Sequence, residues 1–219
     1  MLFFFFFHLM PRIITFDICS VVTLIVLILS LFIRRMTRGT SNVIFFLLTI
    51  TVFLSGIFDI ARLCLPKYLT PSVQSQYLVY GLNYAYYIFR NLSTPVYILF
   101  IFSICGMRHD FYNDMLLKVT WAVPVTGIIG LIVVDCFIHK IFVITPELVY
   151  ERGPWLSYIR IAAIWILAYS IICLIYNKNM LTKHKFYLLL SLSPINIIGI
   201  LIQSYWPQYI VEIICTTFP

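Results

Sequence analysis

The chain has 219 residues, of which 62% are hydrophobic and only 11% are charged, and its mean hydropathy is +1.00. A soluble domain carries about 25% charged residues, so this chain has too few charges to cover a surface that faces water. Its formal charge of +7 does not indicate nucleic-acid binding, because the basic residues lie mostly in short breaks between apolar runs and form no patch. The composition therefore predicts a membrane protein.

Residues 1–15 are predicted to be a lead-in to the first membrane span. The first ten residues lack the basic region and the small-residue cleavage site of a signal peptide. Met10 is an alternative start of translation, which would remove residues 1–9. Detection of a peptide that contains the phenylalanine run, in the expressed protein, would refute that hypothesis.

Six apolar runs are long enough to cross a bilayer. A span needs about 20 mostly apolar residues, and a helix pairs the backbone polar groups that lipid cannot hydrogen-bond. The predicted spans are residues 16–33, 43–64, 77–105, 119–137, 156–176 and 187–205. Their length outweighs their β-branched content, because strands rarely exceed about ten residues. Pro95 is expected to kink the third span.

The last apolar stretch, residues 207–219, is too short to cross the bilayer. A helix of this length rises about 20 Å, against a hydrocarbon core of about 30 Å. We therefore expect an all-α membrane bundle of six complete spans plus the start of a seventh. We interpret the chain as a piece of a longer protein.

Lysine and arginine residues are unevenly divided between the two sides of the predicted bundle. The first, third and fifth loops hold eight of them, whereas the opposite side holds four. By the positive-inside rule, the amino terminus lies outside and these three loops lie in the cytoplasm. A completed seventh helix would end in the cytoplasm.

The fourth loop, on the outer side, contains two β-type runs. Residues 141–144 and 148–152 flank a short turn segment that contains Pro146, and Gly153-Pro154 ends the second run. We predict a small β-hairpin that rests on the helix ends, because a lone hairpin is marginally stable in water. The alternative is an irregular loop.

Ionisable and polar residues inside the spans gather in the outer half of the bilayer or near its midplane. Such groups are costly in lipid unless they are paired or hydrated, so they face the bundle interior. The candidate ligand-binding residues are Asp17, Asp59, Arg62, Asn83, Tyr87, Arg90, Asn91, Asp135, Arg160 and Glu212.

Helical spacing aligns two sets of these residues into stripes. Asp59 and Arg62 share a face of the second span, and Asn83, Tyr87 and Arg90 share a face of the third. The stripes predict a polar cavity open to the outside, in which arginines bind an anionic group. The alternative is structural: ion pairs and amide hydrogen bonds would hold the helices in register. Asp17 and Asp135 would then simply snorkel to the interface.

The sequence gives little indication of catalysis, and no metal or cofactor is expected. The six cysteines form no CxxC pair, and the four histidines are scattered over both sides of the predicted bundle. No phosphate-binding loop or nucleophile elbow is present. A small transporter or channel subunit stays open as an alternative, because Pro95 and Pro194 interrupt two spans, although no internal repeat accompanies them.

Short segments in chain order carry a resemblance to a known family. They are Phe16-Asp-Ile-Cys19, Phe32-Ile-Arg-Arg-Met36, Phe58-Asp-Ile60, Asn91-Leu-Ser-Thr-Pro-Val-Tyr97, Val149-Tyr-Glu-Arg-Gly-Pro154 and Ile202-Gln-Ser-Tyr-Trp-Pro207 with Val211-Glu212. In these segments the chain resembles the amino-terminal seven-helix sensor region that precedes GGDEF diguanylate cyclase domains in many Clostridia-type bacteria. Each segment is short, but together they span most of the chain.

The resemblance implies a sensor in the bacterial plasma membrane that relays an extracytoplasmic or intramembrane signal to a cytoplasmic domain making cyclic di-GMP. The chain contains no GGDEF motif, so we expect no enzymatic activity from it alone. The predicted function is a membrane-embedded receptor module whose output domain is missing from this chain. The expected partners are the lipid bilayer and an unidentified small-molecule ligand, with a homodimer as a further possibility and no nucleic acid.

Overall fold

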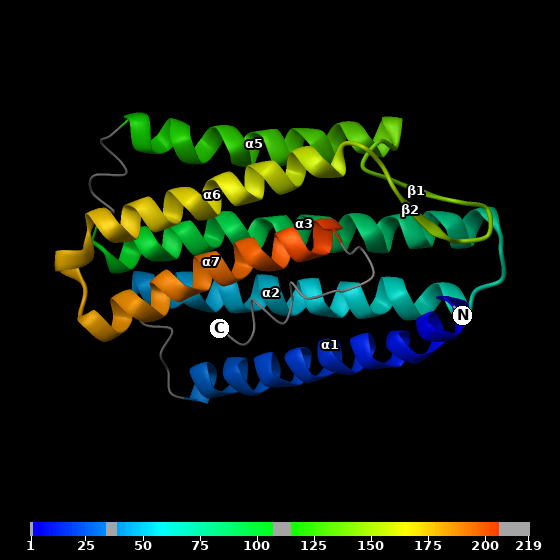
Figure 1. The fold of residues 1–219 in the computed structure, drawn as a ribbon, viewed down its shortest axis with the longest axis horizontal. Coiled ribbons are helices and arrows are strands. Elements are labelled where there is room, and N and C mark those ends of the chain that lie inside the picture. Colours follow the sequence, from blue (N-terminus) through cyan, green and yellow to red (C-terminus); the bar gives the residue numbers. More distant parts are fainter. Residues whose placement is uncertain (1, 34–38, 107–114, 206–219) are drawn as a thin grey trace.

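The computed structural model of the chain describes residues 2–33, 39–106 and 115–205, with side chains for residues 17–33, 39–106, 118–202 and 204. Long helices dominate these ranges (Figure 1). They are α1 (Leu2–Ile33), α2 (Thr40–Cys64), α3 (Val73–Ile104), α5 (Met115–Ile138), α6 (Leu156–Tyr176) and α7 (Lys183–Tyr205). Short 3-10 helices follow α2 at Leu65–Lys67 and α6 at Lys178–Met180. The prediction of a mostly helical chain is confirmed.

Five of the helices are long and apolar enough to cross a membrane. The qualifying segments are Thr40–Lys67, Val73–Ile104, Lys118–Ile138, Leu156–Tyr176 and Lys183–Ile202. Many large apolar side chains on these helices are exposed, as contact with lipid favours; Ile161 on α6, for example, is 64% exposed. In α1 the described apolar segment Asp17–Ile33 is shorter. Five of the six predicted spans therefore correspond to helices that are long and apolar enough to cross a membrane. The partial span 207–219 lies outside the described residues.

The helix boundaries differ most from the prediction at the amino terminus. α1 begins at Leu2, so most of the predicted lead-in is helical. α3 begins at Val73, several residues before the predicted start, because the Ser72 hydroxyl accepts a hydrogen bond from the Ser75 N–H (3.2 Å) and caps the helix. α3 remains helical through Pro95.

Successive helices run back and forth between the two ends of the bundle (Figure 1). The start of α1, the α2–α3 connection and the β-hairpin lie at one end, here called the hairpin end, and the α6–α7 connection lies at the other. α3 supplies much of the buried core, including Val79, Tyr86, Ile98 and Ile101. This arrangement agrees with the alternating loops of the predicted topology, whereas the orientation in the membrane stays a prediction.

A two-stranded antiparallel hairpin connects α5 to α6, as predicted. Its strands are β1 (Phe142–Ile144) and β2 (Tyr150–Arg152). The hairpin rests on α3, because Gln76 Nε2 donates to Ile144 O (2.7 Å) and the Ile144 N–H donates to the Tyr80 hydroxyl (3.0 Å). These contacts supply the support that a lone hairpin lacks.

Candidate ligand-binding site

Polar faces of α2 and α3 meet near the hairpin end, as the helical spacing predicts. Asp59 Oδ1 lies 2.5 Å from Arg62 Nη2, and the two side chains are 0% and 10% exposed. Arg62 Nη1 lies 3.5 Å from Asn83 Oδ1, and the guanidinium carbon lies 3.9 Å from the centroid of the Tyr86 ring. For these residues the structure agrees with the structural alternative: a buried ion pair and an amide contact join the two helices.

Arg62 is also one wall of a small cavity beneath the hairpin, which we call the arginine cleft. The cleft has a volume of about 50 Å³ and is bounded by α2, α3, α6, α7 and β2. Its lining residues are Arg62, Tyr86, Tyr87, Arg90, Asn91, Tyr150, Arg152, Leu156, Ile159, Arg160, Ala163 and Ile200. Five of the predicted candidates therefore lie together: Arg62, Tyr87, Arg90, Asn91 and Arg160.

Two lining residues, Tyr150 and Arg152, come from the hairpin and were not predicted as site residues. They alternate along β2 with Glu151, so both lie on the opposite face of the strand from Glu151. The Tyr150 hydroxyl lies 2.6 Å from the Tyr87 hydroxyl, which connects the hairpin to α3. The two-residue period of the predicted second strand is the signal that could have identified them.

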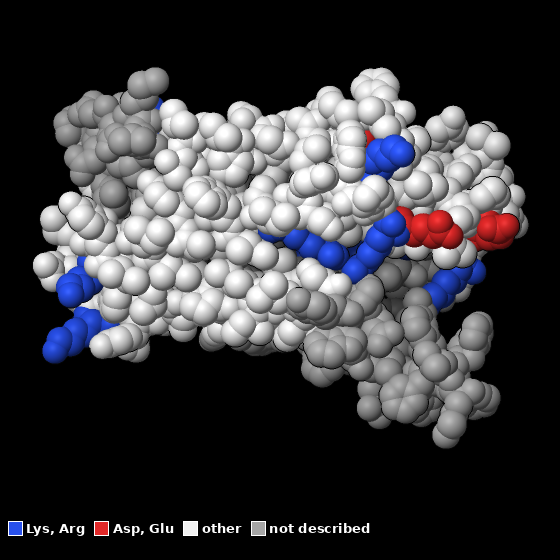
Figure 2. Space-filling view, turned by 45° about the horizontal axis from the view of Figure 1, so that its top comes forward, with Lys and Arg blue, Asp and Glu red and all other residues white. Residues whose placement is uncertain are grey.

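The arginine cleft is strongly basic. Arg160 on α6 is close enough to Arg90 and Arg152 for the positive charge of each to repel its own. No acidic side chain lines the cleft in the part of the chain that the structure describes, and the neighbouring Asp59 is paired with Arg62. Figure 2 shows basic groups in a line along the middle of one side of the bundle, ending beside acidic groups at the hairpin end. A bound anion would relieve the repulsion between these arginines.

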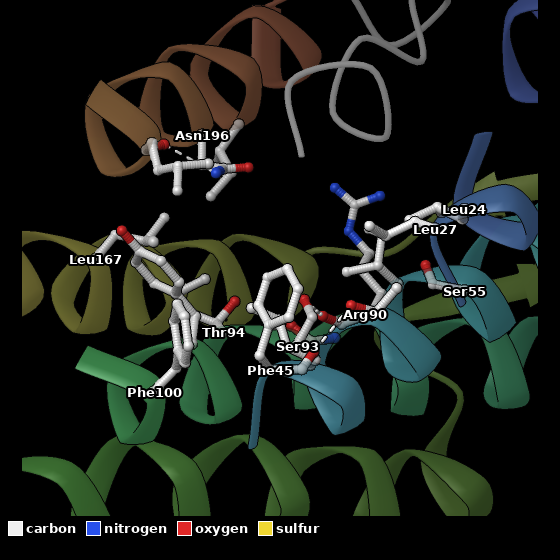
Figure 3. A pocket seen from close by; sticks show the side chains of 18 of the residues that line it. Leu24, Leu27, Phe45, Ser55, Arg90, Ser93, Thr94, Phe100, Leu167 and Asn196 are labelled. Atoms are coloured by element: carbon white, nitrogen blue, oxygen red, sulfur yellow. Dashed lines mark hydrogen bonds between the residues drawn. The ribbon is translucent and has the colours of Figure 1, made fainter. Parts of the chain in front are cut away.

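A larger cavity, the apolar chamber, lies beside the arginine cleft and shares lining residues with it. It has a volume of about 300 Å³ and is bounded by α1, α2, α3, α6 and α7. Apolar side chains such as Leu24, Leu27, Phe45 and Phe100 form most of its wall. Figure 3 shows Arg90 projecting from α3 beside the two leucines of α1. Arg90 lines both cavities and so stands at their junction.

Asp17 is buried between α1 and α2, close enough to Asp59 and Arg62 to interact electrostatically with both. The two helices approach closely at Gly56, where an added Cβ atom would lie 2.9 Å from Val21 Cγ2. Neither carboxyl oxygen of Asp17 has a hydrogen-bond partner among the described residues. The alternative that Asp17 snorkels to the interface is therefore wrong, because its side chain is fully buried.

Asp135 supports the hairpin rather than the arginine cleft. It is fully buried near the end of α5, so it does not snorkel either. Its Oδ1 accepts hydrogen bonds from the backbone N–H groups of Lys140 (2.5 Å) and Ile141 (2.6 Å), and its Oδ2 accepts one from the Tyr84 hydroxyl (3.1 Å). These bonds attach the start of the hairpin to α5 and α3.

Asp135→Asn is expected to loosen the hairpin. The amide loses the negative charge that strengthens the bonds to the two backbone N–H groups, at a cost of about 1–2 kcal/mol. Hydrogen exchange in nanodiscs should be faster than in the wild type at the amides of Lys140 and Ile141. Tyr84→Phe, which removes one bond to the same carboxylate, is the control and should have a smaller effect. Wild-type exchange rates in Asp135→Asn would contradict the assigned role.

Asn83, another predicted candidate, does not line the cleft. Asn83 contacts Arg62 and donates from Nδ2 to Val79 O (2.8 Å) within its own helix. Glu212 lies outside the described residues. Among the residues that are described, no three histidine, cysteine or acidic side chains are grouped as a metal site would require.

Comparison with known proteins identifies no relative: no family model, no curated protein and no solved structure matches the chain. The resemblance to the sensor regions of GGDEF proteins therefore stays a prediction. What this site can bind has to be argued from its own side chains.

Proposed function

We propose that this chain is the membrane-embedded sensory module of a bacterial signalling protein, and that its ligand carries a negative charge. The observation that carries the proposal is the convergence of Arg90, Arg152 and Arg160 on one cavity whose described walls hold no acidic side chain. Ionisable groups within a membrane are costly, and they commonly mark ligand or ion pathways. Binding of an anion is a function that accounts for them.

The contacts of α7 offer a route by which such a ligand could act on the rest of the protein. Ser193 Oγ on α7 lies 2.8 Å from Ser170 Oγ on α6 and 3.1 Å from the Tyr97 hydroxyl on α3, and this hydroxyl donates to Leu189 O (2.9 Å). A ligand that draws the arginines of α3 and α6 together would therefore shift both helices against α7. We propose that this shift passes through the carboxyl-terminal side of the chain to a cytoplasmic output domain of the diguanylate cyclase type.

The proposed topology places the hairpin end outside the cell. The start of α1 lies at that end (Figure 1), and residues of the hairpin line the arginine cleft. The loops richer in lysine and arginine would then face the cytoplasm. The ligand would then reach the cleft from outside the cell or from the outer leaflet of the bilayer.

The natural gene tests this function. We expect a diguanylate cyclase coding region downstream of codon 219. In cells that express the natural gene product, replacing Arg90 and Arg160 together by glutamine should change the cyclic di-GMP level at equal expression. An unrelated downstream gene, together with unchanged cyclic di-GMP, would contradict the proposal.

A small transporter or channel subunit is the second candidate, and Asp17 is the observation that favours it. A fully buried carboxyl group without a hydrogen-bond partner among the described residues resembles the groups that relay protons through transporters. Proton entry into proteoliposomes, followed with a pH-sensitive dye, distinguishes the two functions. A transporter should give a flux that is lost in Asp17→Asn, whereas a sensory module should give no flux.

A further inference from the structure

The arginine cleft and the apolar chamber are adjacent parts of one site and have chemically different walls. Both are lined by Arg90, Asn91, Ala163 and Ile200, so they meet at these residues. Toward the hairpin the walls are mainly arginine and tyrosine, and on the other side they are mainly leucine and phenylalanine. A ligand that fills both parts must itself have a charged end and an apolar end.

The chamber has the length and the surface to accept a hydrocarbon chain. Its wall along α3 extends from Arg90 to Phe100, which corresponds to about 15 Å of helix. Two of the polar side chains that line the chamber bond within their own helices: Ser93 Oγ donates to Arg90 O (2.6 Å), and Asn196 Nδ2 donates to Leu192 O (2.9 Å). The volume of about 300 Å³ is at the lower end of the range for small-molecule sites.

We propose that this cavity binds a single-chain amphiphile, with its anionic headgroup between Arg90 and Arg160 and its hydrocarbon tail in the apolar chamber. The inference rests on the proposed function, because it names the class of ligand for the same cleft. The headgroup is a carboxylate or a phosphate monoester, the anions that guanidinium groups bind in bidentate geometry. With the hairpin end outside, the ligand has the orientation of a lipid in the outer leaflet.

A ligand that occupies only the cleft or only the chamber does not account for the side chains that line the other one. A free inorganic anion would neutralise the arginines but leave an apolar chamber that offers water few hydrogen bonds. A neutral lipid would fill the chamber but bring no negative charge to the arginines that line the cleft. An anionic amphiphile satisfies both halves.

The test uses the full chain in phosphatidylcholine nanodiscs and a palmitic acid probe that carries a diazirine near its terminal methyl group. Irradiation should label residues at the far end of the chamber, such as Phe100, Leu188 and Leu192. Palmitate and hexadecyl phosphate should compete with the probe. Hexadecanol and inorganic phosphate should not compete, because each lacks one half of the proposed ligand.

Two variants address the two halves of the cavity separately. Arg90→Gln removes a charged contact to the headgroup, and Ala163→Phe fills the junction through which the tail enters the chamber. Each substitution should lower labelling at least about tenfold. Ile161→Phe adds the same ring to the lipid-facing side of α6, and Lys185→Gln removes a positive charge at the opposite end of the bundle. Both controls should label like the wild type.

Arg90 also donates a hydrogen bond to the Tyr86 hydroxyl, so Arg90→Gln could alter the fold as well as the site. Size-exclusion profiles and unfolding temperatures are therefore recorded with every labelling measurement. Ala163→Phe tests occupancy of the same cavity without this ambiguity, because it leaves every arginine in place.

Equal competition by hexadecanol and palmitate, or labelling that neither variant reduces, would overturn the proposal that the ligand is an anionic amphiphile. Competition by inorganic phosphate alone would also overturn it, but the sensory function would stand with a soluble anion as ligand. If the wild-type protein binds the amphiphile as expected, but replacing Arg90 and Arg160 leaves the cyclic di-GMP level unchanged, the sensory function is overturned instead. Mass spectrometry of the protein purified from cells grown with and without added amphiphile shows whether the ligand comes from the cell's own bilayer or from the medium.

Discussion

Replacing Gly153 with alanine is expected to release the hairpin from its base. An added Cβ atom would lie 1.9 Å from Lys140 O and 2.5 Å from Lys140 C, which backbone atoms cannot accommodate without moving. The Gly153 N–H donates to Ile141 O (2.8 Å) and the Trp155 N–H donates to Lys140 O (3.2 Å), so such a movement breaks the bonds that close the hairpin. The expected cost is about 3 kcal/mol, the upper end for an overpacked site.

Hydrogen exchange of the hairpin amides in nanodiscs measures this effect, and Gly81→Ala is the matched control. A Cβ atom at Gly81 would meet no atom within 4 Å, and the residue lies inside α3. Alanine there should stabilise the helix by about 0.5–1 kcal/mol. Faster exchange confined to Gly153→Ala is expected. Wild-type exchange in that variant would show that the base of the hairpin is not packed as described.

Asp59→Asn is expected to destabilise the bundle more than any other single change at the site. It removes the carboxylate that lies 2.5 Å from Arg62 Nη2 and leaves the arginine charge buried above the Tyr86 ring. Breaking a buried ion pair from one side costs about 3–5 kcal/mol, because the remaining charge is left without its partner. Titration with a denaturing detergent, followed by circular dichroism, should show the midpoint shifted to a lower detergent fraction.

Asp17→Asn is the matched control, because it makes the same chemical change at a carboxylate that is just as deeply buried. Both aspartates have fully buried side chains, but the oxygens of Asp17 have no hydrogen-bond partner among the described residues. A neutral amide should be tolerated or stabilising there, since burial of an unpaired carboxylate is costly. Equal destabilisation by the two substitutions would show that the pairing of Asp59 with Arg62 is not what stabilises α2.

Much of the fold could be predicted because it depends on local patterns. A long apolar run must form a helix in lipid whatever its neighbours are, which explains why residues 156–176 were predicted with the bounds that α6 has. The hairpin followed from two short β-type runs that end at Gly153-Pro154. The long α1 was not predicted, because the phenylalanine-rich start gives no signal that separates a helix extension from a lead-in.

The candidate site could be predicted only in part, because helical spacing identifies which side chains share a face but not what they contact. Spacing correctly brought Tyr87, Arg90 and Asn91 to one cavity. It could not show that Asp135 would bond to the backbone of the hairpin, since that contact depends on the path of the loop after α5. The contribution of Arg152 also depends on how the hairpin folds back over α3 and α6.

The unfolding temperature of Arg160→Gln in nanodiscs tests most directly whether the arginine cleft is a ligand site. The structure records no ion pair for Arg160 among the described residues, and Arg90 and Arg152 are close enough to repel it. We expect glutamine to raise the unfolding temperature of the purified protein or leave it unchanged, because it removes one of three like charges. A fall of several degrees would show that Arg160 holds the resting bundle together and would contradict a cleft kept for an anionic ligand.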